Sequence, residues 1–131
     1  LADLTGARVL AEIGDDRTRF SDARALKAYA GSAPVTRASG RSISITFRRI
    51  KNDRLAATGW VWGFSAAGNA GPARDHYLRR RAHGDRHSAA LRHLVNKMLG
   101  QLYYCLQNQQ EFDPLKGFGQ PVTTAPEPVA A

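Results

Sequence analysis

An apolar stripe between residues 91 and 106 constrains the fold of this chain more than any other feature. Its members recur at helical spacing over about four turns, and they are Leu91, Leu94, Val95, Met98, Leu99, Leu102 and Leu106. A helix with such a stripe gains most of its stability from neighbours that cover the stripe. We therefore predict a long helix near residues 87–109 at the centre of a mainly α-helical domain.

Four further helices are predicted before this one, because apolar residues recur at helical spacing between recognisable start and stop signals. The signals are a stop at Gly14, an N-cap at Ser21 with a terminating Gly31, a cap at Asn52 for a helix that runs to about Ala67, and a start at Pro72 for a helix that ends near Gly84. The pair Asp113-Pro114 is expected to close the long helix.

A short extended segment is predicted near residues 42–48. Ile43, Ile45 and Phe47 alternate there with polar residues, which is the period of a strand. Residues 31–41 contain Pro34 and fit either a loop or an extended segment. The predicted fold class is thus mainly α, with one short extended element near the middle of the chain.

The uncharged stretch from Leu55 to Ala73 is 19 residues long and raises the question of a membrane span. A spanning helix needs about 20 predominantly apolar residues, whereas this stretch contains four glycines and a proline. The sequence therefore predicts a buried helix and no membrane association. The role of Trp60 and Trp62 within it stays open. Because the chain has one cysteine and no recognisable secretory signal, a reducing cytoplasm is the expected compartment.

Positive charge is concentrated in the middle of the chain. The protein carries 19 Lys and Arg against 11 Asp and Glu, a net charge of +8. Residues 17–97 hold 17 basic and four acidic residues, a net charge of +13. Most of the basic residues are arginines, whose guanidinium groups pair bidentately with phosphate. These numbers predict a surface that binds nucleic acid, with a merely solvated basic face as the alternative.

The densest basic run is Arg79-Arg80-Arg81. Three consecutive residues of a helix point to different sides of it, so these arginines suit an extended polyanion better than a single pocket. A solvated helix end is the alternative interpretation.

The segment from residue 33 to residue 42 is a candidate site for chemistry. Its Ser39 precedes a glycine, which permits close backbone approach, and Arg37 and Arg41 flank it, with Arg48 and Arg49 following. Cations on both sides of a serine would stabilise a developing alkoxide and clamp a phosphate under attack. A Ser-Gly step is common in loops and no base lies nearby in the sequence, so these residues alone do not identify a nucleophile.

No metal or cofactor site is predicted in this chain. The four histidines and the single cysteine lack the spacing of structural zinc sites, and no acidic residue completes a ligand set at helical spacing.

Three blocks in the first third of the chain, taken together and in order, resemble the C-terminal domain of DEDD (RuvC-like) insertion-sequence transposases, the IS110 group. The blocks are residues 10–15 (LAEIGD), 20–31 (FSDARALKAYAG) and 33–42 (APVTRASGRS). The segments 75–84 (DHYLRRRAHG), 89–92 (AALR), 105–106 (CL) and 112–113 (FD) are similar to the distal part of the same domain. The resemblance covers residues 1–114, which leaves residues 115–131 as a predicted flexible tail.

The resemblance implies a function in DNA transposition and recombination. The serine of the Ser-Gly step, Ser39 in this chain, would be the nucleophile that forms a phosphoserine link to DNA during strand exchange. A RuvC-like partner domain would supply four acidic residues and a divalent metal, and a structured non-coding RNA would guide the choice of target. The start of the family domain is similar to a helix-hairpin-helix, whose backbone amides bind DNA phosphate.

This chain departs from the family pattern in two ways. It starts inside the helix-hairpin-helix-like motif, and it contains no RuvC-like domain. Full-length members of the family are enzymes, whereas we expect this chain alone to be inactive. Whether the chain has any enzymatic activity of its own is left open. The alternative function is that of a catalytically dead remnant, acting only as a basic nucleic-acid-binding module or as an oligomerisation module. The long amphipathic helix at 87–109 favours a homo-oligomer.

Overall fold

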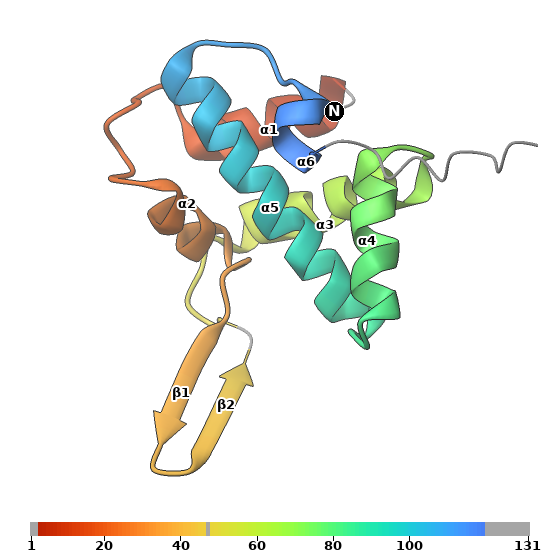
Figure 1. The fold of residues 1–131 in the computed structure, drawn as a ribbon. Coiled ribbons are helices and arrows are strands. Elements are labelled where there is room, and N and C mark those ends of the chain that lie inside the picture. The colour runs from red at the N-terminus through yellow and green to blue at the C-terminus, as the bar shows by residue number, and fades with distance from the viewer. Residues whose placement is uncertain (1–2, 47, 120–131) are drawn as a thin grey trace, which may run out of the picture.

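The computed structural model describes residues 3–46 and 48–119. Its elements are α1 (Asp3–Ile13), α2 (Ala23–Ala30), β1 (Val35–Ser39), β2 (Ser42–Thr46), α3 (Asp53–Gly68), α4 (Pro72–Ala82), α5 (His87–Asn108) and α6 (Pro114–Phe118). The helices form one body, and the hairpin of β1 and β2 extends from it (Figure 1). The mainly α fold class is confirmed.

Helix α5 is the centre of the body, as its apolar stripe predicts. Helices α2, α3 and α4 pack against it, and α1 packs against α3. The buried residues of α5 are Ala90, Leu91, Leu94, Val95, Met98 and Leu99. The other helices complete the core with Val9, Ile13, Leu26, Ala30 and Leu55. The helix ends at Asn108, close to the predicted end near residue 109, and its C-cap Gln109 has φ 48°, so the pair Asp113-Pro114 does not close it. Pro114 instead begins α6.

The N-cap of α2 is Asp22, one residue after the predicted Ser21. The carboxylate of Asp22 accepts a hydrogen bond from the Ala25 backbone N–H at 2.8 Å. Serine and aspartate are comparable caps, so the sequence could not separate them. The predicted end is confirmed, because Gly31 lies in the left-handed region at φ 77°.

Helix α3 places its glycines against α5. The buried residues of α3 are Leu55, Gly59 and Gly63, spaced four apart. A Cβ atom on Gly63 would lie 2.5 Å from Cγ2 of Val95, and one on Gly59 would lie 3.2 Å from its Cγ1. The two helix backbones therefore approach closely, because glycine has no side chain that would hold them apart at these two positions.

The bulky residues of α3 lie outward as a consequence. Trp60, Val61 and Phe64 are 41%, 56% and 61% exposed, respectively, whereas Trp62 packs against the core. The prediction of a buried helix in this stretch is therefore wrong for one face of α3. No helix among residues 3–46 and 48–119 is long and apolar enough to span a membrane.

Gly63→Ala tests the close approach of α3 to α5. We expect a net loss of about 1 to 2 kcal/mol in the free energy of unfolding, because overpacking against Val95 outweighs the gain of about 1 kcal/mol in helix propensity. Gly68→Ala is the control, since no atom lies within 4 Å of the Cβ added there. Urea denaturation measures both variants. Equal stabilities of the two would contradict the close packing.

The chain after α5 is described only as far as Gly119. The predicted tail, residues 115–131, begins inside α6, and residues 120–131 lie outside the described residues. The helix-hairpin-helix interpretation of the start stays a prediction.

Candidate nucleic-acid interface

Strands β1 and β2 form a regular antiparallel hairpin. The register pairs Val35 with Thr46 at the base and Ser39 with Ser42 at the tip. Gly40 and Arg41 connect the strands, and Gly40 has φ 56°. A two-residue turn with glycine in its first position is typical of type II′ hairpins. The predicted extended segment is thus the second strand, which ends at residue 46, and the preceding segment is the first strand.

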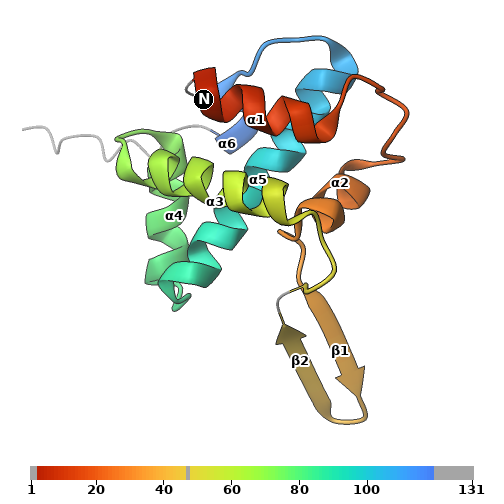
Figure 2. The ribbon, with the colours of Figure 1, turned by 180° about the vertical axis from the view of Figure 1, so that it is seen from behind.

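The hairpin projects away from the helices (Figures 1 and 2). Among the described residues, no helix packs extensively on either strand. Ile43 and Ile45 share one face of β2 and are 72% and 67% exposed. An isolated two-stranded hairpin is marginally stable in water. The two isoleucines therefore leave an exposed apolar surface on the hairpin.

The tip of this hairpin contains the candidate nucleophile. Ser39 is the last residue of β1, directly before Gly40, and Arg41 is exposed on the turn. The structure describes the backbone of Arg37 and Ser39 but not their side chains. The turn therefore places Ser39, Gly40 and Arg41 together at the point farthest from the helical body (Figure 1).

The two arginines that follow β2 differ in their surroundings. Arg48 is half-buried, and its Nε donates a hydrogen bond to the carbonyl of Ala33 at 3.2 Å. This bond joins the chain entering the hairpin to the chain leaving it. Arg49 is exposed and stays accessible to a phosphate. Arg48 thus has a structural contact that the sequence did not reveal.

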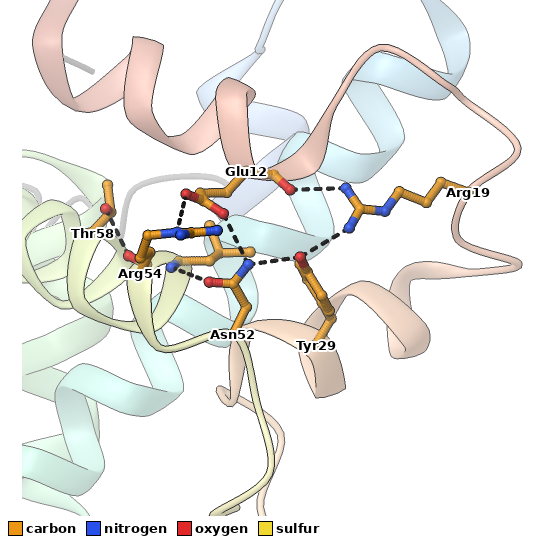
Figure 3. Close-up of polar contacts among 7 residues, drawn as sticks. Glu12, Arg19, Tyr29, Asn52, Arg54 and Thr58 are labelled. Atoms are coloured by element: carbon orange, nitrogen blue, oxygen red, sulfur yellow. Dashed lines mark hydrogen bonds and ion pairs between the residues drawn. The ribbon is translucent and has the colours of Figure 1, made fainter.

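A polar network joins the start of α3 to α1, to α2 and to the segment between them (Figure 3). Asn52 Nδ2 donates to Glu12 Oε2 at 2.9 Å and to the Tyr29 hydroxyl at 2.6 Å. Arg54 Nε donates to Glu12 Oε1 at 2.8 Å, and Arg19 donates to the Tyr29 hydroxyl at 2.9 Å. The hydrogen bond from Asn52, together with the Arg54 contact, holds the pKa of Glu12 below its ordinary value. The network links α1, α2 and α3 at the point where the chain returns from β2.

The three consecutive arginines of α4 are not equivalent. Arg80 Nε lies 2.7 Å from Asp85 Oδ2, and this hydrogen bond is the main cause that lowers the pKa of Asp85. Arg79 and Arg81 are exposed, although Arg81 also donates to the Asp85 carbonyl at 2.9 Å. The turn between α4 and α5 and the hairpin extend from the same side of the body (Figures 1 and 2). The two cationic segments therefore face the same side.

A pair of histidines lies between α4 and α5. His76 Nε2 and His93 Nδ1 are 3.3 Å apart. Burial, aided by the positive charges of Lys97, His93 and two arginines, lowers the pKa of His76 to about 4. Burial also lowers the pKa of His93. The pair is 17 residues apart in the sequence, so no local spacing could predict it.

The histidine pair predicts a loss of stability on mild acidification. His76 has a lower pKa in the folded state than its ordinary value of 6.5. The unfolded chain therefore binds more protons than the folded chain between pH 6.5 and about 4, and stability falls as the pH decreases through that window. We expect about 1 to 2 kcal/mol of loss, after allowance for solvent screening.

Urea denaturation across this window checks the prediction. His76→Gln removes one titrating group and is expected to flatten the dependence. His83→Gln, at an exposed position after α4, controls for the loss of a histidine elsewhere. The prediction is wrong if His76→Gln keeps the full slope. The carboxylates with lowered pKa values, Glu12, Asp16 and Asp85, lose their contributions only below their ordinary values near 4.

Comparison of the sequence with known protein families identifies the family of this chain. Residues 1–79 match the family described as "Transposase IS116/IS110/IS902 family". The chain belongs to this transposase family. The matched residues include α1, α2, the whole hairpin and α3. The resemblance found in the sequence is thereby confirmed.

Curated relatives from this family cover most of the chain. The "Mini-circle putative transposase for IS117" of Streptomyces coelicolor is 59% identical over 118 residues, 90% of this chain and 28% of the relative. The "Insertion element IS116 uncharacterized 44.8 kDa protein" of Streptomyces clavuligerus is 33% identical over 115 residues, 87% of this chain and 29% of the relative. The "Insertion element IS900 uncharacterized 42 kDa protein" of Mycobacterium paratuberculosis is 32% identical over 113 residues, 85% of this chain and 28% of the relative. The chain thus spans under a third of each relative's length.

Proposed function

We propose that this chain is the DNA-contacting, serine-bearing part of an insertion-sequence transposase, which transfers strands through a covalent phosphoserine intermediate. Membership of a transposase family supports a role in insertion-sequence transposition. The observation that carries the finer proposal is the projecting hairpin, whose tip contains Ser39 beside Gly40. A tip that stands clear of the helices can enter a DNA groove or a partner's site without rearrangement of the core.

The proposed chemistry is attack on a phosphodiester. Ser39 Oγ gives up its proton and forms a bond to phosphorus, while the bond from phosphorus to one deoxyribose oxygen breaks and that oxygen takes up a proton and leaves as a hydroxyl, so that no net proton is gained or lost. Attack by a new strand's hydroxyl on the phosphoserine reverses these bond changes and completes the exchange. Arg37 and Arg41 flank Ser39 in the sequence and would clamp the phosphate oxygens during the attack.

A divalent metal belongs to the RuvC-like domain expected elsewhere in the full-length protein. Among residues 3–46 and 48–119, no three His, Cys, Asp or Glu side chains lie close enough to hold a metal ion. The described residues therefore do not fit such a site, and no step proposed for this chain passes through a metal.

The basic surface supplies the electrostatic part of DNA binding. Arg41, Arg49, Arg79 and Arg81 are exposed toward solvent, and each phosphate that they neutralise would release condensed counterions. Arg48 would act mainly by holding the Ala33 carbonyl, and Arg80 by holding the Asp85 carboxylate. Further partners implied by the family resemblance are a guide RNA and the RuvC-like domain. The long amphipathic helix favours further copies of the same protein, and the single cysteine favours the cytoplasm.

Mapping of a covalent adduct tests this function. The full-length protein is incubated with insertion-element DNA, denatured and digested, and the peptides that carry a nucleotide are identified by mass spectrometry. The expected result is a nucleotide attached to Ser39. An adduct at another residue, or strand transfer without any protein adduct, would overturn the phosphoserine mechanism. DNA binding without a covalent adduct and without strand transfer would favour a remnant that has lost catalysis.

A further inference from the structure

A small cavity opens at the base of the hairpin. It has a volume of about 140 Å³, and its lining includes Gly31 and Ser32 from the end of α2, Lys51, Trp60 from α3 and Arg92 from α5. This volume equals about five water molecules at about 30 Å³ each. It is smaller than the roughly 300–1,000 Å³ of sites that enclose a whole small-molecule ligand. The cavity can therefore enclose only part of a ligand, and the rest of the ligand would lie on the surface around it.

One wall of this cavity is an exposed indole. Trp60, on α3, is 41% exposed. Its ring meets the His87 ring edge-on with centroids 6.4 Å apart, and His87 Nδ1 lies 2.7 Å from the Tyr77 hydroxyl. These contacts hold the indole in one orientation. Phe64, 61% exposed one turn farther along α3, extends the aromatic surface.

Two cations lie at the same cavity. Arg92 is half-buried and donates a hydrogen bond to the neutral carbonyl of Ser32 at 2.9 Å, and the negative charge nearest to it in its surroundings is that of Asp85, which is itself bound to Arg80. Ser32 is itself buried and bonded to Asn96 Oδ1 at 3.1 Å, which fixes the position of that carbonyl. Lys51 Nζ donates to the Arg48 carbonyl at 3.1 Å.

Lys51 is held above Gly31. A Cβ atom on Gly31 would collide with the Lys51 side chain, so the lysine stem packs directly on the glycine backbone. Lys51 Nζ is also 3.9 Å from an Asp53 carboxylate that is 88% exposed, and an exposed ion pair of this kind contributes little. The ammonium group therefore stays available to an incoming phosphate.

We propose that this cavity binds an unpaired nucleotide, with the base stacked on Trp60 and the phosphate between Lys51 and Arg92. The inference rests on the nucleic-acid binding proposed above and adds a site for a single strand. Unpaired bases stack on aromatic side chains, and a cationic groove follows their phosphates. An apolar protein segment would satisfy the indole but would leave the two cations facing an uncharged surface. A nucleotide supplies both the ring and the charge.

The position of the cavity suits such a role. Ser32 lies three residues before β1, and Lys51 lies five residues after β2. A strand bound at the cavity would therefore lie at the base of the same hairpin that presents Ser39 at its tip. Unpaired nucleotides at the base would set which phosphodiester reaches the tip.

The test compares single strands with duplexes. Binding of the 131-residue chain to an end-labelled oligothymidylate and to a duplex of equal length is measured by fluorescence anisotropy at one salt concentration. Trp60→Leu is expected to weaken single-strand binding by about tenfold to hundredfold and to leave duplex binding unchanged. Tyr104→Leu, an exposed aromatic on α5, is the matched control and is expected to change neither.

Two further measurements separate a loss of nucleotide contact from a loss of folding. In a Trp62→Phe background Trp60 is the only tryptophan, and its fluorescence is expected to be quenched by the oligothymidylate but not by the duplex. Lys51→Gln is expected to lower the slope of log affinity against log salt by about one for the single strand. A matching oligouridylate shows whether DNA or RNA is the preferred strand, and tighter binding of either supports the site.

Three outcomes would overturn the proposal. If Trp60→Leu binds single strands and duplexes as wild type does, the proposed nucleotide site is wrong, whereas the proposed DNA-binding function is unaffected. A change in Trp60 fluorescence on concentrating the chain without nucleic acid would assign the surface to a second copy. If the chain binds neither the single strand nor the duplex, the proposed nucleic-acid binding is itself wrong.

Discussion

Full-length protein carrying Ser39→Ala is expected to form no covalent adduct with DNA and to lose strand transfer by at least about a thousandfold, because removal of a nucleophile leaves only binding and electrostatic contributions. DNA affinity and the free energy of unfolding are expected to stay close to wild type, since Ser39 ends an exposed hairpin strand outside the core. Denaturing gel electrophoresis of labelled DNA measures the adduct, and a strand-transfer assay measures the rate.

Ser42→Ala provides the matched control. Ser42 pairs with Ser39 directly across the turn, in the same hairpin and with the same side chain. The two substitutions therefore perturb the hairpin similarly, and only one removes the proposed nucleophile. Adduct formation by Ser42→Ala at nearly the wild-type rate is expected. Equal losses in both variants would indicate a structural role for the tip, and full activity of Ser39→Ala would end the assignment of Ser39.

Sequence periodicity predicted the helices well because their signals are local. The stripe of α5, the stop at Gly14 and the cap at Asn52 all depend on residues within one or two turns of each other. Strand β1 was harder to predict, since it has only five residues between Pro34 and Gly40, shows no clear apolar alternation, and is defined by its pairing with β2. That pairing is a contact between segments, which a single-strand pattern does not record.

The candidate site was predictable in composition but not in arrangement. The sequence shows three equal arginines at 79–81, whereas the fold commits Arg80 to Asp85. It shows an uncharged stretch from Leu55 through the rest of α3, whereas packing through Gly59 and Gly63 directs Trp60 outward. In both cases the surroundings of the side chain depend on contacts with a neighbouring segment, and these contacts become known only from the arrangement of the helices.

Asn52→Ala is expected to lower the free energy of unfolding by about 2 to 4 kcal/mol. The change removes the N-cap hydrogen bond to the Leu55 backbone N–H at 2.9 Å and the bonds to Glu12 and Tyr29 (Figure 3). A cap contributes about 1 kcal/mol, and a hydrogen bond to a charged group about 1.5 to 3 kcal/mol. Hydrogen exchange should rise at the Asn52 backbone N–H, which donates to the Tyr29 carbonyl at 2.7 Å. Urea denaturation measures the loss of stability.

Asn52→Asp separates the cap from the network. The new carboxylate can still accept from the Leu55 N–H, but it replaces the donor that faces Glu12 with a second negative charge. Because neighbouring carboxylates raise the pKa of one of the pair, this variant should be less stable than wild type at pH 7 and should regain stability as the pH falls toward 5. Wild-type stability of Asn52→Asp at pH 7 would show that the cap alone matters. The start of α3 would then be held by its cap and by backbone contacts rather than by the side chains of Glu12 and Tyr29.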